Sequence, residues 1–80
     1  MITYEYKFKT SAAVETTRGE TTPVAEIIRN IAMNNGAFFT SKCVGGIQIL
    51  SISCLSEKSS LGVFISTREI KGVSMKAIKN

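Results

Sequence analysis

Residues 38–56 read FFTSKCVGGIQILSISCLS, and the register of the predicted sheet follows from them. Two apolar segments flank the pair Gly45-Gly46. A glycine pair supplies the positive φ angles that a two-residue turn between antiparallel strands requires, so the stretch predicts a β-hairpin. A turn of this length also fixes the register, because Val44 must lie opposite Ile47.

An amphipathic helix is predicted immediately before the hairpin. Thr22 is suited to cap a helix N-terminus, Pro23 to be the first helical residue, and Glu26 to lie in the first turn. Asn34-Asn35-Gly36 is a stop signal, so the helix spans about 23–35. Apolar residues at spacings of three and four share one side, which we expect to pack on the sheet: Val24, Ile27, Ile28, Ile31 and Ala32.

The chain begins MITYEYKFKT, which alternates with a period of two, as in a strand with one buried face. Tyr4, Tyr6 and Phe8 share that face. A strand that precedes the helix joins the sheet by a crossover, which turns the aromatic face toward the helix and the core. Residues 10–22 are predicted to be a connection, with a turn at Arg18-Gly19 and a short strand around 13–17.

The residues after the hairpin fit a continued sheet. Glu57 to Ser60 predicts a polar turn and 61–67 a third strand, which completes an antiparallel meander. The tail, 68–80, fits two patterns. One is a helix that begins with a capping box of Ser66 and Glu69, and the other is a strand in which Val73, Met75 and Ala77 alternate. We favour the helix.

The sequence therefore predicts a single α+β domain over residues 1–80. Its antiparallel sheet has four or five strands, the main helix (about 23–35) packs on one face, and a second helix lies at the C-terminus.

This register assigns side chains to the two faces of the sheet. The face toward the helix is apolar and contains Phe39, Leu50, Ile52, Cys54, Val63 and Ile65. On the opposite face, Phe38 and Phe64 fall in one row, and Lys42, Ile49 and Arg68 fall in a row two steps along the strands. Aromatic rings thus lie near cations on the second face.

Three hypotheses follow for this second face. It is covered by the C-terminal segment or by a second copy, or it contacts another protein, or it binds single-stranded nucleic acid by stacking bases on rings and pairing phosphates with cations. The binding residues under the last two hypotheses are Phe38, Phe64, Lys42, Arg68 and Ile49, with Lys71, Lys76 and Lys79 of the tail.

The composition argues against catalysis. Ten Lys and Arg oppose six acids, all Glu, giving a net charge of +4, and the chain has no His. Such a balance permits attraction to nucleic acid or to an acidic protein. Without His, with scattered glutamates and without a phosphate-binding or nucleophile motif, we expect no enzyme and no cofactor.

The two cysteines are predicted to be free thiols. Two thiols without His cannot complete a tetrahedral zinc site, so we expect no metal. The register places Cys43 and Cys54 at opposite ends of the hairpin, which is too far for a disulfide. We expect both to be small buried hydrophobes in the reducing cytoplasm, and no apolar run approaches the roughly 18 residues that would cross a membrane.

The functional hypothesis is a small non-catalytic protein that acts by protein–protein contact, such as a stoichiometric inhibitor or regulator of a larger complex. Small proteins of this form are common among products of phages and mobile elements that antagonise a host enzyme or defence system, and we extend that hypothesis to this chain. The alternative is a basic nucleic-acid-binding module that uses the aromatic and basic sheet face. A homodimer is a third hypothesis.

Overall fold

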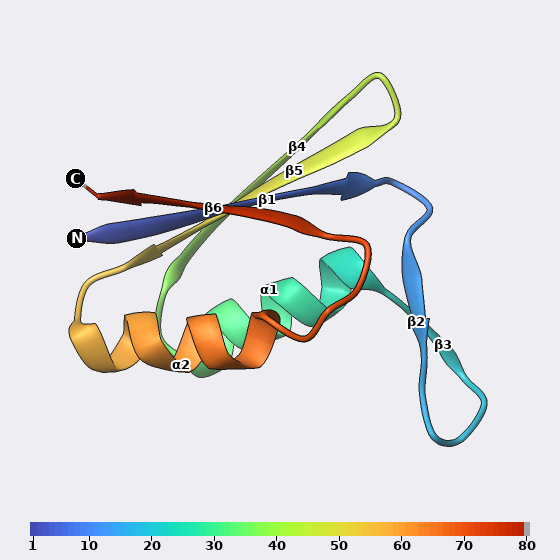
Figure 1. The fold of residues 1–80 in the computed structure, drawn as a ribbon, viewed down its shortest axis with the longest axis horizontal. Coiled ribbons are helices and arrows are strands. Elements are labelled where there is room, and N and C mark those ends of the chain that lie inside the picture. Colours follow the sequence, from blue (N-terminus) through green and yellow to red (C-terminus); the bar gives the residue numbers. More distant parts are fainter. Residues whose placement is uncertain (80) are drawn as a thin grey trace.

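The computed structural model describes residues 1–79, with Lys79 described by its backbone alone. Its elements in chain order are β1 (Ile2–Lys9), β2 (Ala13–Glu15), β3 (Thr21–Pro23), α1 (Val24–Asn34), β4 (Phe38–Val44), β5 (Ile47–Cys54), α2 (Glu57–Thr67) and β6 (Ser74–Lys79). Strands β4-β5-β1-β6, in that order, form one antiparallel sheet, and β2 and β3 form a separate small hairpin. Both helices lie on the same side of the large sheet (Figure 1). The predicted α+β class is confirmed.

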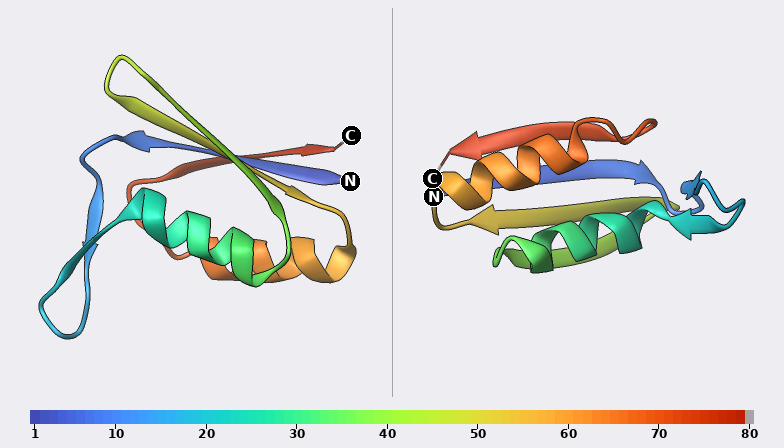
Figure 2. Two further views of the ribbon diagram at one scale, coloured as in Figure 1. Left: turned by 180° about the vertical axis from the view of Figure 1, so that it is seen from behind. Right: turned by 90° about the horizontal axis from the view of Figure 1, so that it is seen from below.

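The order of the elements is that of a split βαβ fold. With the β2–β3 hairpin set aside, the chain runs β1-α1-β4-β5-α2-β6, and β5 lies between β1 and β4 in the sheet. This is the ferredoxin-like topology, which occurs in proteins of many functions and therefore identifies none. Figure 2 shows α1 over the β4–β5 half of the sheet and α2 over the β1–β6 half.

The core lies between the sheet and the two helices. Tyr4, Tyr6 and Phe8 of β1 are buried, as their alternation predicted, together with Ile28 of α1 and Ile52 of β5. Their inward direction follows from the crossover, which places α1 on the side to which the even-numbered residues of β1 point.

The predictions of the β4–β5 hairpin and of the main helix are confirmed. Val44 lies opposite Ile47, and Gly45 and Gly46 both have positive φ. The predicted cap is wrong: Pro23 and not Thr22 is the N-cap, no side chain makes a capping hydrogen bond in the described structure, and the helix therefore begins at Val24. It stops as predicted at Asn35, before Gly36 with its positive φ.

The prediction of a strand over residues 61–67 is wrong, because residues 57–67 form α2. The signal for this helix is its cap: the Ser56 side chain accepts a hydrogen bond from the Ser59 backbone N–H (3.1 Å). The buried residues of α2 are Ser60, Val63 and Thr67, which share one helical face. Contacts on that face outweigh the β-branched residues that favoured a strand.

The preference for a C-terminal helix is also wrong. Gly72 has a φ of 79°, which breaks the chain into a turn, and residues 74–79 then pair with β1 as strand β6. The alternation of Met75 and Ala77 was the correct signal. The connection 10–22 does contain the predicted strand and turn, but the strand is shorter (β2) and has a partner, β3.

Candidate interaction surfaces

The outer face of the sheet, on the side away from the helices, carries four of the chain's lysines. Its rows follow from the register: Phe38, Ser53, Thr3 and Ile78 form the first, Thr40, Ser51, Glu5 and Lys76 the second, and Lys42, Ile49, Lys7 and Ser74 the third, with Val44, Ile47 and Lys9 beyond. Glu5 is the single acid among the described residues of this face, and it lies 3.6 Å from the Lys7 ammonium. The outer face is therefore basic.

The predicted site residues separate into two groups. Three of them lie on the outer face as expected: Phe38, Lys42 and Ile49. Lys76 also lies on this face, on edge strand β6. Phe64 and Arg68 were expected beside Phe38 and Lys42, and this is wrong. Residue 64 belongs to α2 and residue 68 is its C-cap, on the opposite side of the sheet.

The remaining two predicted residues lie in the tail. Lys71 lies in the exposed turn between α2 and β6. Lys79 pairs with Ile2 through its backbone, and its side chain lies outside the described residues. None of the binding roles predicted for these residues is tested by their positions.

The outer face does not form an aromatic platform. Within the described residues, Phe38 on edge strand β4 is its single aromatic side chain. Proteins that stack bases on a four-stranded sheet place several aromatics there. In this chain Tyr4, Tyr6 and Phe8 of central strand β1 point the other way, into the core.

Helix α2 buries two polar residues, Ser60 and Thr67. The Tyr4 hydroxyl lies 2.8 Å from Ser60 Oγ, and the Tyr6 hydroxyl lies 2.9 Å from Thr67 Oγ1. Burial raises the pKa of Tyr6 to about 12, although the hydrogen bond with Thr67 acts in the opposite direction. Two tyrosines on β1 thus define which side of α2 faces the sheet. Sequence reasoning missed this pairing, whose only signal was two core tyrosines in need of polar partners.

One flank of α2 is apolar and exposed. Leu61, Phe64 and Ile65 are 59%, 37% and 47% exposed. They occupy spacings i, i+3 and i+4, so they lie on adjacent turns of one helical face. Phe64 also contacts the Tyr4 ring, with centroids 6.3 Å apart, which fixes its position. We call Leu61, Phe64 and Ile65 the α2 patch.

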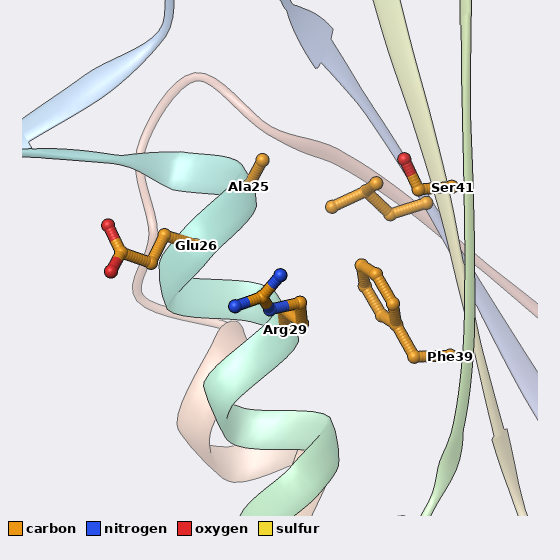
Figure 3. A pocket seen from close by; sticks show the side chains of 6 residues that line it. Ala25, Glu26, Arg29, Phe39 and Ser41 are labelled. Atoms are coloured by element: carbon orange, nitrogen blue, oxygen red, sulfur yellow. The ribbon is translucent and has the colours of Figure 1, made fainter.

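A hollow of about 400 Å³ lies between α1 and β4 (Figure 3). Ala25, Glu26, Arg29, Phe39, Ser41 and Leu50 line it. The Ser41 hydroxyl already accepts a hydrogen bond from Gln48 Nε2 (2.8 Å), and the chain has no His to activate it. The hollow therefore offers no nucleophile paired with a base.

The cysteines are free, at the two ends of the hairpin where the register predicted them. Cys54 is buried as expected, whereas Cys43 is exposed, because β4 is an edge strand. Among the described residues, no three potential ligands from His, Cys, Asp and Glu are close enough to hold a metal ion. In the same part of the chain, neither helix is long and apolar enough to span a membrane.

No protein-family model, curated protein or solved structure matches this chain. The function of the chain must therefore be inferred from its own surfaces.

Proposed function

We propose that the protein acts without catalysis, by binding a larger protein through the α2 patch. The observation that supports this proposal is the placement of the apolar residues of α2. Its buried side holds Val63 with the polar Ser60 and Thr67, whereas Leu61 and Ile65 are among the exposed apolar residues of the described chain. A helix that only supported the core would bury most of its large apolar residues.

The energetics favour a partner at this patch. Transfer of a Leu, Ile or Phe side chain from water to an apolar environment contributes about 1.5–3 kcal/mol. The i, i+3, i+4 spacing is that of helices that insert apolar anchors into a groove of a partner. Exposure of three such side chains on one rigid helix gives a small but coherent anchor set.

The flanking charges, with that of the whole chain, suggest the chemistry of the partner. Lys58, Arg68 and Lys71 are exposed at or just beyond the ends of α2 and outnumber the exposed acids Glu57 and Glu69 there, and the whole chain carries a net charge of +4. We therefore propose a partner with an apolar groove and an acidic rim. A protein of this size that occupies such a groove acts as a stoichiometric inhibitor or regulator, and antagonism of a host enzyme or defence complex stays a prediction.

The test is capture from a native lysate with matched variants, followed by affinity measurement on the purified partner. In Leu61→Gln/Ile65→Gln the anchors become polar at positions that do not support the core. Met33→Gln makes the same change on the exposed side of α1.

We expect the double variant to lose at least about tenfold in affinity, equivalent to 1.4 kcal/mol. Met33→Gln should bind as the unmodified protein does, and nuclease should not change the capture. Equal binding by all three proteins, or binding that nuclease abolishes, would contradict the proposal.

A second candidate function is nucleic-acid binding by the outer face, and the four lysines on that face favour it. Phosphate contacts release counterions, so binding should weaken steeply between roughly 50 and 200 mM salt. In a mobility-shift assay with single- and double-stranded RNA and DNA, Lys42→Gln/Lys76→Gln should reduce this salt dependence, and Lys58→Gln on α2 should not. Absence of any shift at low salt would remove this candidate.

A further inference from the structure

Strand β4 is a weakly protected edge of the sheet. It is the terminal strand in the order β4-β5-β1-β6, so within the described residues one side of its backbone has no strand partner. Natural edge strands usually carry lysine or other charges, a proline or a bulge that discourages further pairing. Residues 38–44 contain no proline, pair with β5 in unbroken register, and have one charge, Lys42, which points outward.

The sequence of β4 is complementary to itself. We propose that two copies of this chain pair through β4 in antiparallel fashion, about a two-fold axis at Ser41. Opposed residue numbers then sum to 82, so Phe38 lies opposite Val44 of the second copy. These two residues are the exposed apolar side chains at the ends of β4, 62% and 60% exposed. By symmetry, each dimer contains two such Phe38–Val44 pairs, in which each side chain covers the other.

Other registers of the same symmetry are worse. Both copies keep their helices on one side of the sheet only when the paired numbers sum to an even value. A sum of 84 places Lys42 opposite Lys42 of the second copy, and like charges in direct opposition are destabilising. A sum of 80 places Lys42 opposite Phe38 and leaves Val44 without a partner. The sum of 82 places Lys42 opposite Thr40.

The directions of the backbone N–H and C=O groups of β4 fit the same register. In an antiparallel ladder closed by a two-residue turn, Val44 and Ile47 form a hydrogen-bonded pair, and such pairs alternate along the strand. The backbone groups of Phe39, Ser41 and Cys43 therefore face the free edge. With Ser41 on the axis, these three residues meet the same three residues of the second copy.

Helix α1 leaves room for the second copy. Figure 3 shows Ala25 and Arg29 of α1 across the hollow from Ser41 and Phe39 of β4, so α1 runs along the Phe38 half of β4. The other half, toward Gly45-Gly46, extends away from both helices (Figure 1). The two-fold axis places α1 of each copy beside the bare half of the other copy's β4. The hollow between α1 and β4 of each chain is lined by one acid and one base, Glu26 and Arg29, so the charges near the proposed interface are balanced.

The opposite edge of the sheet does not have this property. Strand β6 contains Lys76 and Lys79 and no acid over residues 74–79. Among the described residues, β6 carries none of the exposed large apolar side chains, so self-pairing there would cover no apolar pair like Phe38 and Val44. The self-complementary edge is therefore β4.

Disulfide trapping tests the register directly. Ser41→Cys, in a Cys43→Ser background, places two thiols on the axis, with Cα atoms about 5.5 Å apart, within disulfide range. Thr40→Cys in the same background places its Cα atoms about 8 Å apart, outside that range. On mild oxidation with oxidised glutathione, we expect the first variant to form a covalent dimer and the second to stay monomeric. Equal trapping of both variants would overturn the register.

Charge substitution tests the same pairing without a cross-link. Light scattering over a range of concentrations should show dimer for the unmodified protein and monomer for Phe38→Lys. Phe38→Lys/Val44→Glu should restore the dimer, because the two new charges face one another. Leu55→Lys is the control at an equally exposed residue outside β4. A chain that stays monomeric at high concentration, or a double variant that fails to recover, would refute the proposal. Circular dichroism of each variant confirms that it is folded.

Discussion

The hydrogen bonds between β1 and α2 allow a quantitative test of what orients α2. The Thr67 hydroxyl donates to the Val63 carbonyl (2.8 Å), so its oxygen accepts from the Tyr6 hydroxyl (2.9 Å). Tyr6 is 1% exposed and Thr67 is also buried. The Tyr6 hydroxyl therefore depends on one acceptor, and that acceptor belongs to α2.

The two single substitutions should differ in cost. Thr67→Val leaves the Tyr6 hydroxyl buried without an acceptor, which destabilises by about 1–3 kcal/mol. Tyr6→Phe removes the donor but keeps the hydrogen bond from the Thr67 hydroxyl to the Val63 carbonyl, so it should cost about 0.5–1.5 kcal/mol. The double variant replaces both partners with apolar groups of similar shape. We expect it to cost less than the sum of the singles, with a coupling free energy of about 1 kcal/mol.

Urea denaturation followed by circular dichroism measures these free energies of unfolding. A domain of this size has a total stability of about 4–12 kcal/mol, so each variant should remain folded. Tyr6→Phe combined with Thr40→Val, on the outer face, is the control pair, and its effects should add. If the effects of Tyr6→Phe and Thr67→Val also add to within about 0.5 kcal/mol, the hydrogen bond does not couple α2 to β1.

Three further predictions follow from burial and packing. Because burial raises the pKa of Tyr6 to about 12, the unfolded chain loses this proton first, near its ordinary pKa of about 10. The free energy of unfolding should fall by about 2–3 kcal/mol as pH rises from 10 to 12, measured by denaturation against Tyr6→Phe, which lacks this component. A Cβ at Gly62 would collide with the Asn35 side chain, so Gly62→Ala should destabilise the protein. Gly62→Ala/Asn35→Ala removes the collision and should show the gain in helix propensity of about 1 kcal/mol in the same assay. A single Gly62→Ala substitution that stabilises the protein would contradict this packing. Ile28→Ala, at a fully buried position, should cost about 2–5 kcal/mol, whereas Met33→Ala on the exposed side of α1 should stay within about 0.5 kcal/mol in thermal denaturation.

The elements that sequence predicted correctly are those with local signals. The Gly45-Gly46 turn requires positive φ, and it fixed both the hairpin and its register. The stop at Gly36 bounded α1 for the same reason, and the β1 alternation placed its aromatic residues in the core. In each case the deciding interaction lies within a few residues along the chain, where propensity and periodicity are informative.

The elements that it misassigned depend on contacts between distant residues. Residues 61–67 contain Val63, Ile65 and Thr67, which favour a strand by propensity. They form a helix whose buried polar side chains pair with Tyr4 and Tyr6, more than 50 residues away in the chain. The predicted grouping of Phe38 with Phe64 failed for this reason alone, because it required both to belong to one sheet.

The two proposed surfaces lie on different halves of the molecule. Helix α1 and edge strand β4 form one half, and α2 with β6 forms the other (Figure 2). Pairing through β4 therefore leaves both copies of the α2 patch accessible, at opposite ends of a continuous eight-stranded sheet and on the same side of it. If both proposals hold, the dimer is a bivalent ligand, and a partner that presents two suitably spaced grooves gains affinity from effective concentration without any new contact. The exposed apolar residues of α2 and the self-complementary edge of β4 then serve one purpose, since each is a cost to an isolated monomer that the assembly with its partner removes.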